Sequence, residues 1–116
     1  MEQINKIELR GTVGTVYSNK PVGETVKTRF SIVTNYAYKS RGGEPVIETL
    51  WLNVTAWEGK DVQDLSELKK GMIVHLIGRL RPNKYTASDG VERQDYEVIA
   101  REVVIVEEEA LSAQTW

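Results

Sequence analysis

The 116-residue sequence predicts an all-β fold, a small closed barrel of five strands in one domain. Apolar residues recur at every second position over much of the chain, which is the period of half-buried strands. Glycines interrupt these segments where a barrel strand would bulge or bend. Only one segment has helical spacing. We therefore expect a barrel domain at 1–106, followed by a short acidic stub at 107–116.

Five strands are expected, at 4–16, 25–38, 48–60, 72–85 and 93–106. The first contains Gly11 and Gly14, so we expect it to be long and coiled. The connections "YSNKPVGE" and "KSRGGEP" are rich in turn residues and are expected to be loops. Asp89-Gly90 is a hairpin signal, which predicts that the last two strands form an extended ribbon.

One short helix is predicted between the third and fourth strands, in "GKDVQDLSELKKG". Asp61 suits its N-cap, and Gly71 suits the position after its last turn. Val62, Leu65 and Leu68 recur at helical spacing, so this stripe would pack against the barrel. The resulting order β-β-β-α-β-β is the layout of a five-stranded OB barrel.

The third strand, which includes "LWLNVTAW", has two contrasting faces, because successive side chains of a strand point to opposite sides. The even positions form an apolar face that we expect to be buried: Leu50, Leu52, Val54 and Ala56. The odd positions place two indoles beside small polar residues: Trp51, Asn53, Thr55 and Trp57. At about 3.3 Å per residue the two indoles lie roughly 20 Å apart, too far to touch.

Charge is segregated along the chain, although the net charge is only −2. Without Glu107–Glu109, residues 1–106 carry 15 basic and 14 acidic residues. Two windows, 25–43 and 68–88, contain no acid. Both interleave cations with aromatic rings: Lys27, Arg29, Tyr36, Tyr38, Lys39 and Arg41 in the first, and Arg79, Arg81, Lys84 and Tyr85 in the second.

Outward aromatic rings beside cations are the features that bind single-stranded nucleic acid. Unpaired bases stack on flat side chains, worth about 1–3 kcal/mol per base, while Lys and Arg neutralise phosphates. Stacking accepts any base, so such a surface should have little sequence preference. Strand-face parity selects Arg29 and Arg81 as phosphate contacts.

Other functional classes lack the residues that they need. Without cysteine there is no disulfide, thiolate nucleophile or Cys-ligated zinc. His75 is the single histidine and, without a second ligand or a neighbouring nucleophile, it is expected to be structural. Asp61 and Asp64 are explained as carboxylates in the first turn of the predicted helix, where they interact favourably with the helix dipole. There is no phosphate-binding loop or dinucleotide motif. We expect no enzyme, cofactor or metal site, and, without a signal peptide or membrane span, a cytoplasmic protein.

Other interpretations of the outward aromatics stay open. Trp51 and Trp57 could lie in a subunit interface, where tryptophan is enriched, and Tyr36 and Tyr38 could pack instead of stacking. The second functional hypothesis is an oligomeric OB-fold adaptor of the primosomal type, which docks replication proteins on this face. RNA also stays open as a ligand, because a stacking surface does not distinguish the sugars by itself.

The sequence resembles a known family over about residues 4–106. The segments "NKIELRGTVG", "FSIVTNYAY", "TLWLNVTAWEGK", "LKKGMIVHLIGRLRPNKYT" and "YEVIAREVVIV" follow in the order and spacing of bacterial single-stranded DNA-binding proteins. The resemblance implies an OB-fold homo-oligomer, usually a tetramer, that binds single-stranded DNA in replication, recombination and repair. The family's stacking positions fall on Tyr38, Trp51, Trp57 and Tyr85, and its basic positions on Lys6 and Lys84. Position 53, often arginine in the family, is Asn53.

The end of the sequence departs from this family pattern. Members usually continue through a Gly/Pro/Gln-rich linker to an acidic tip that ends in Pro-Phe and recruits replication and repair enzymes. This sequence stops at Trp116 after Glu107–Glu109, as a truncated chain or a tail-less member would. The resemblance therefore implies binding to single-stranded DNA, but no recruitment of partners through such a tip.

Overall fold

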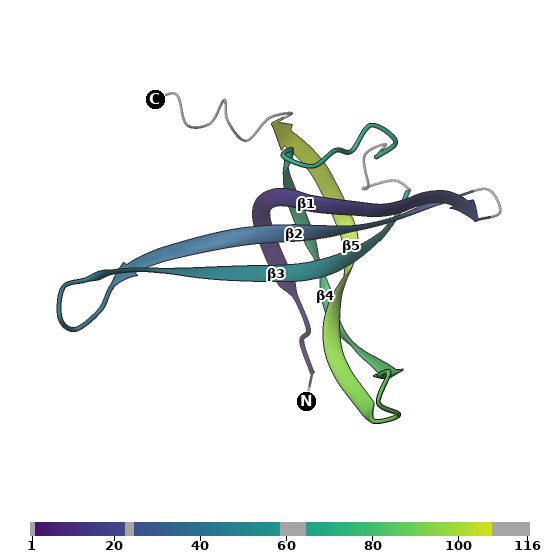
Figure 1. The fold of residues 1–116 in the computed structure, drawn as a ribbon. Helices are drawn as coiled ribbons and strands as arrows, with labels where there is room; N and C mark the ends of the chain where they lie inside the picture. Colours follow the sequence, from purple (N-terminus) through teal and green to yellow (C-terminus); the bar gives the residue numbers. More distant parts are fainter. Residues whose placement is uncertain (1, 23–24, 59–64, 108–116) are drawn as a thin grey trace.

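Five long strands pair edge to edge until the sheet closes into a barrel (Figure 1). In chain order they are β1 (Ile7–Val22), β2 (Thr25–Lys39), β3 (Pro45–Trp57), β4 (Ile73–Thr86) and β5 (Glu92–Glu107). Around the barrel the order is β1-β2-β3-β5-β4. This is a computed structural model, and it describes residues 2–22, 25–58 and 65–107. The all-β, five-stranded prediction is confirmed.

The barrel closes because β1 pairs with two strands. Its first half pairs with β4 and the remainder with β2, so that Thr12 is opposite both Ile73 and Val33. Gly11 lies at this bend, where an added Cβ would be 2.4 Å from the carbonyl oxygen of Val33. The predicted long, bent strand is confirmed. It continues to Val22, however, so the loop expected at 17–24 is wrong for 17–22.

Two hairpins project from the barrel in different directions (Figure 1). β2 and β3 stay paired as far as Lys39 and Pro45. β4 and β5 stay paired as far as Thr86 and Glu92, which confirms the predicted extended ribbon. Both turns contain a glycine with positive φ: 82° at Gly43 and 81° at Gly90.

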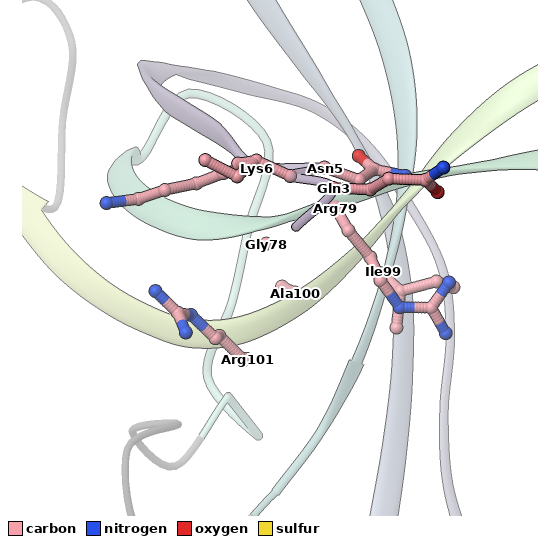
Figure 2. A pocket seen from close by; sticks show the side chains of 9 residues that line it. Gln3, Asn5, Lys6, Gly78, Arg79, Ile99, Ala100 and Arg101 are labelled. Atoms are coloured by element: carbon pink, nitrogen blue, oxygen red, sulfur yellow. The ribbon is translucent and has the colours of Figure 1, made fainter. Parts of the chain in front are cut away.

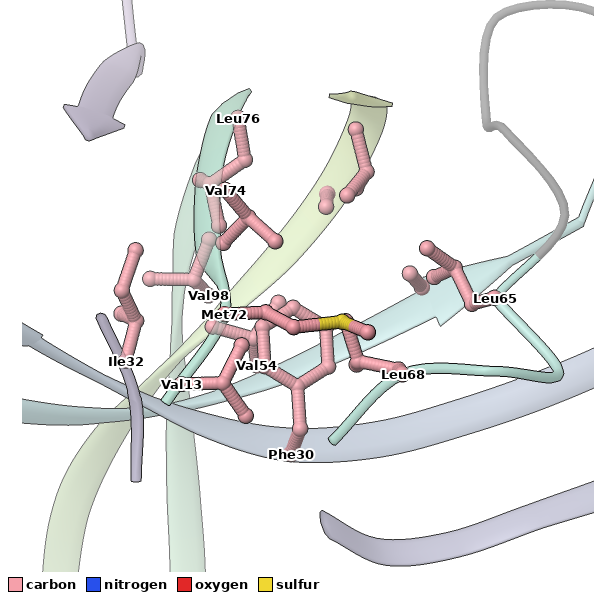
Figure 3. Packing of buried hydrophobic residues seen from close by; sticks show 13 residues of the cluster. Val13, Phe30, Ile32, Val54, Leu65, Leu68, Met72, Val74, Leu76 and Val98 are labelled. Carbon is pink, nitrogen blue, oxygen red and sulfur yellow. The ribbon is translucent and has the colours of Figure 1, made fainter. Parts of the chain in front are cut away.

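The barrel interior is filled by apolar side chains from every strand (Figure 3). Each strand contributes at least one fully buried residue: Val13, Phe30, Val54, Val74 and Val98. The apolar face expected on β3 is buried only at its end. Leu50 is 46% exposed because β5 pairs with β3 over Val54–Ala56 alone, and the preceding part of β3 lies in the projecting hairpin.

The predicted helix is wrong for the described part of its segment. Asp61, Val62 and Asp64 lie outside the described residues, and 65–72 forms turns. The amide of Leu68 donates to the carbonyl oxygen of Leu65 at 3.1 Å. Such a bond between residues three apart belongs to a tight turn or to 3₁₀ geometry, not to the α-helical ladder.

Besides its internal turn bonds, the backbone of 65–72 also bonds to β1. Gly71 donates its amide hydrogen to the carbonyl oxygen of Val13, and the amide of Val13 donates to the carbonyl oxygen of Met72, at 2.9 and 2.8 Å. Gly71 has a φ of 97°. Leu65 and Leu68 still enter the core, as their apolar spacing predicted (Figure 3).

Gly78→Ala should destabilise the barrel, because the added Cβ would lie 2.2 Å from the carbonyl oxygen of Ile99. Overpacking of this kind costs about 1–3 kcal/mol in the free energy of unfolding, which urea denaturation measures. Gly42→Ala is the matched control, since its nearest atom would be Ser40 Oγ at 3.9 Å. This control should be neutral or more stable by about 0.4–1 kcal/mol. Equal stability of the two variants would contradict a close approach at Gly78.

Candidate nucleic-acid interface

The outward face of β1, β2 and β3 carries both tryptophans of β3. Trp51 and Trp57 are 52% and 41% exposed, whereas Val54 and Ala56 between them are buried in the core. The alternation predicted from the sequence is therefore confirmed for the indoles. They point away from the barrel interior.

Trp51 reaches across β2 to β1. A Cβ added to Gly14 would lie 2.6 Å from Cη2 of Trp51 and 2.8 Å from Oγ of Ser31. Ser31 is fully buried, and its Oγ accepts the amide hydrogen of Thr15 at 2.9 Å. The absence of a side chain at Gly14 thus lets the indole lie close to the β1 backbone with a broad surface exposed.

The hydroxyl of Tyr17 reaches from β1 to the part of β3 between the two tryptophans, and sequence reasoning assigned this residue no role. Its hydroxyl donates a hydrogen bond to Oδ1 of Asn53 at 3.1 Å, and Asn53 lies between Trp51 and Trp57 along β3. The phenol ring is exposed. Three aromatic side chains from two strands therefore form one exposed row, here called the aromatic row: Trp51, Tyr17 and Trp57.

Two cations lie on β2 along this row. Lys27 is opposite Trp57, and its Nζ lies 5.4 Å from the centre of the indole ring, within cation–π range. Arg29 is opposite Thr55 and exposed, on the same face. Of the residues predicted from the sequence, the structure thus places Trp51, Trp57 and Arg29 together, and it adds Lys27 and Tyr17.

Tyr38 lies on the other face of β2. It is opposite Val46 and has the parity of the buried Phe30, whereas Arg29 has the opposite parity. Its ring is exposed on the projecting hairpin and lies 6.1 Å, between centroids, from Tyr36. The structure does not bring Tyr38 into the aromatic row.

The predicted contacts from the acid-free window 68–88 lie on the β4–β5 hairpin: Arg81, Lys84 and Tyr85. Tyr85 is exposed and opposite Arg93, and Lys84 has the opposite parity to Tyr85. Arg81 forms an ion pair with Glu97, a carboxylate buried against it, and its Nε donates to Oε1 at 3.0 Å. The charge of Arg81 is therefore already compensated within the protein.

Lys6 lies ahead of β1, in a segment that Asn5 attaches to β4. The side chain of Asn5 donates to the carbonyl oxygen of Leu80 at 2.8 Å and accepts the Leu80 amide hydrogen at 3.0 Å. This pair of bonds holds Lys6 beside Arg79 and Arg101, where all three line one pocket.

Comparison with known proteins assigns the chain to a family. The model of the single-strand binding protein family matches residues 4–106. The chain belongs to this family. The resemblance seen in the sequence and the prediction of a binding protein instead of an enzyme agree with this result.

Among its relatives, the single-stranded DNA-binding protein of Neisseria meningitidis serogroup A is 35% identical over 102 residues, which are 86% of this chain and 58% of that protein. The protein of the same name from Xanthomonas axonopodis pv. citri is 36% identical over 103 residues, 86% and 56% of the two chains. The chain thus spans less than three fifths of the length of these relatives.

The solved structure of "Plasmodium falciparum SSB complex with ssDNA" superposes with a TM-score of 0.74 at 25% identity, over 92% of this chain and 98% of that one. The OB-fold prediction is therefore confirmed.

Within 2–22, 25–58 and 65–107 no group of His, Asp and Glu residues is arranged to hold a metal ion. In the same ranges no helix has the length and hydropathy to span a membrane.

Gly14→Ala should displace the indole of Trp51 and shift its fluorescence emission to the red, as the ring becomes more hydrated. The measurement uses a chain with Trp57→Phe and Trp116→Phe, because the sequence has three tryptophans. Gly42→Ala in the same background is the control and should leave the emission unchanged. An unshifted spectrum in the Gly14 variant would refute the close contact between this ring and β1.

The turn beyond Tyr85 contains a carboxylate with a lowered pKa. The amide of Val91 donates to Oδ1 of Asp89 at 3.0 Å, and the guanidinium of Arg93 donates to Oδ2 at 2.8 Å. Both bonds favour the ionised form, so the pKa of Asp89 lies below its usual 3.8, with the Val91 amide as the larger cause.

NMR titration should therefore find a lower pKa for Asp89 in the folded chain than in the unfolded chain. Because the folded pKa is the lower one, the carboxylate stabilises the turn above the usual pKa of Asp, and this contribution disappears as pH falls through the folded value. Arg93→Gln should raise the pKa of Asp89 only in part, since the Val91 amide remains. A complete return to the usual value in this variant would show that the amide is not the larger cause.

Proposed function

We propose that this chain binds single-stranded DNA without sequence preference, by stacking bases along the aromatic row. The observation that carries the proposal is the single exposed face on which Trp51, Tyr17 and Trp57 lie. The relatives named as single-stranded DNA-binding proteins and the structure titled as a complex with ssDNA support this ligand class. The chain itself performs no chemical step in this function.

The charges beside the row suit the phosphates of a stacked strand. Lys27 lies against Trp57, and Arg29 lies on the same face with no ion pair among the described residues. A base on Trp57 would thus have a cation within reach of its phosphate. Arg81 is less suited to this role than the sequence indicated, because Glu97 already neutralises it.

The two projecting hairpins would extend the binding surface beyond the barrel. Tyr85 and Lys84 on the β4–β5 hairpin, and Tyr38 on the β2–β3 hairpin, are exposed and are retained as further contacts. Tyr38 lies on the face of β2 opposite to that of Arg29, and Lys84 and Tyr85 point to opposite faces of β4. A strand that uses all of them would therefore contact both faces of the hairpins as well as the aromatic row.

We include in this proposal that the chain acts as a homo-oligomer, a tetramer by its resemblance to the family. The exposed apolar side chains of Val104 and Val106 on β5 support self-association, because apolar surface of this kind is commonly covered in oligomers. Protection of DNA strands in replication, recombination and repair, in the cytoplasm at the nucleoid, completes the proposed role.

Trp51→Ala should weaken binding by about 1–3 kcal/mol, the usual contribution of one base–aromatic stack. Poly-dT should quench the tryptophan fluorescence of the unchanged protein, and the anisotropy of labelled oligo-dT gives the affinity of the variant. Tyr96→Ala, at an exposed aromatic ring outside the row, is the control and should bind normally. The thermal unfolding of both variants should remain cooperative, since neither ring is part of the core.

Two results would contradict this proposal. Absence of quenching at low salt would exclude the stacking face, and, if the protein then captured a replication protein without DNA, the adaptor hypothesis would replace it. Unfolding of Trp51→Ala would assign the indole to packing. Competition between poly-dT and poly-U decides whether DNA is preferred over RNA.

A further inference from the structure

A pocket of about 400 Å³ opens on the barrel where the segment before β1 meets β4 and β5 (Figure 2). Three cations belong to its lining, and the lining contains no acid: Lys6, Arg79 and Arg101. Figure 2 shows their side chains around Gly78 and Ala100. None of the three has an ion pair or a side-chain hydrogen bond among the described residues, in contrast to Arg81 on the same strand as Arg79.

The pocket depends on a bulge between β4 and β5. Ile77 is opposite Glu102 and Gly78 is opposite Ala100, so Arg101 has no partner in the register. Ala100 and Val103 both face the core, although they are three positions apart. A bulge of this kind redirects the extra side chain, and here it turns Arg101 outward, into the pocket.

The pocket is continuous with the face that carries the aromatic row. Arg29 on β2 is opposite Thr55 on β3, Thr55 is opposite Ile99 on β5, and Ile99 is opposite Arg79 on β4. Directly opposite residues share a face of the sheet, and neighbouring strands are about 4.8 Å apart. Arg79 therefore lies roughly 14 Å around the barrel from Arg29, on the same outer surface.

We infer that the DNA strand leaving Trp57 crosses β5 and places its phosphodiester backbone among Lys6, Arg79 and Arg101. Arg79 belongs to the acid-free window 68–88, but neither Arg79 nor Arg101 falls on one of the family's basic positions named above. Three uncompensated cations suit consecutive phosphates, and the apolar floor of Ile99 and Ala100 suits the sugars between them. This inference rests on the proposed function and specifies the course that the strand takes beyond the aromatic row.

The test compares R79Q/R101Q with the control K69Q/K70Q, which removes the same charge from exposed residues outside the pocket. Oligo-dT strands of about 5 and about 15 nucleotides, near the two ends of the range bound by one OB fold, are titrated at several salt concentrations. The short strand covers the aromatic row, and the long strand also reaches the pocket.

On the long strand, R79Q/R101Q should reduce the slope of log K against log salt by about 0.7 for each phosphate that the variant no longer neutralises. The short strand should bind this variant as it binds the unchanged protein, and the control should retain the slope with both strands. An equal slope for R79Q/R101Q and the control on the long strand would overturn the inference.

Failure of the proposed function would give a different result, in which the unchanged protein binds neither strand. If R79Q/R101Q did not fold, K6Q would provide the same test, because Lys6 lies outside the strands and its side chain is exposed. This single variant should lower the long-strand slope by about 0.7. An unchanged slope in K6Q would overturn the inference as well.

Discussion

Closure of the barrel depends on two places where one backbone approaches another too closely for any side chain. At Gly11 the bend of β1 passes against the carbonyl group of Val33, and at Gly78 β4 passes against that of Ile99. Without the approach at Gly11 β1 could not pair with both β2 and β4, and without that at Gly78 β4 could not pair closely with β5, so the sheet would keep free edges. A small barrel must also coil its strands strongly, which register shifts in β1 and β5 permit.

The same irregularities direct the side chains of the candidate interface. A register shift in β1 between Val16 and Ser18 leaves Tyr17 without an opposite residue in the ladder and exposed, beside Asn53. A second shift, in β5, exposes Arg101. The geometry that closes the fold therefore also builds its outer surface, and a regular ladder would have presented different residues there.

The recurrence of apolar residues at every second position was sufficient to predict the strands, the barrel and the outward indoles of Trp51 and Trp57. It could not predict Tyr17, because counting alternate positions fails across a bulge and a turn-rich composition indicated a loop there. The apolar spacing of Leu65 and Leu68 was read correctly as core contact. Its assignment to a helix failed, since the backbone partner of that segment is Val13, which is remote in the sequence. Arg81 was chosen by parity alone, which contains no information about Glu97 on the neighbouring strand.

The attachment of Asn5 to Leu80 has a practical consequence for anyone handling this protein. It holds the beginning of the chain against β4, on the rim of the cationic pocket, instead of letting it extend freely into solvent. Purification tags fused ahead of Glu2 would therefore start next to three positive charges. An acidic tag in that position would compete with DNA for Lys6, Arg79 and Arg101. Such a tag therefore has to be removed before any affinity is measured.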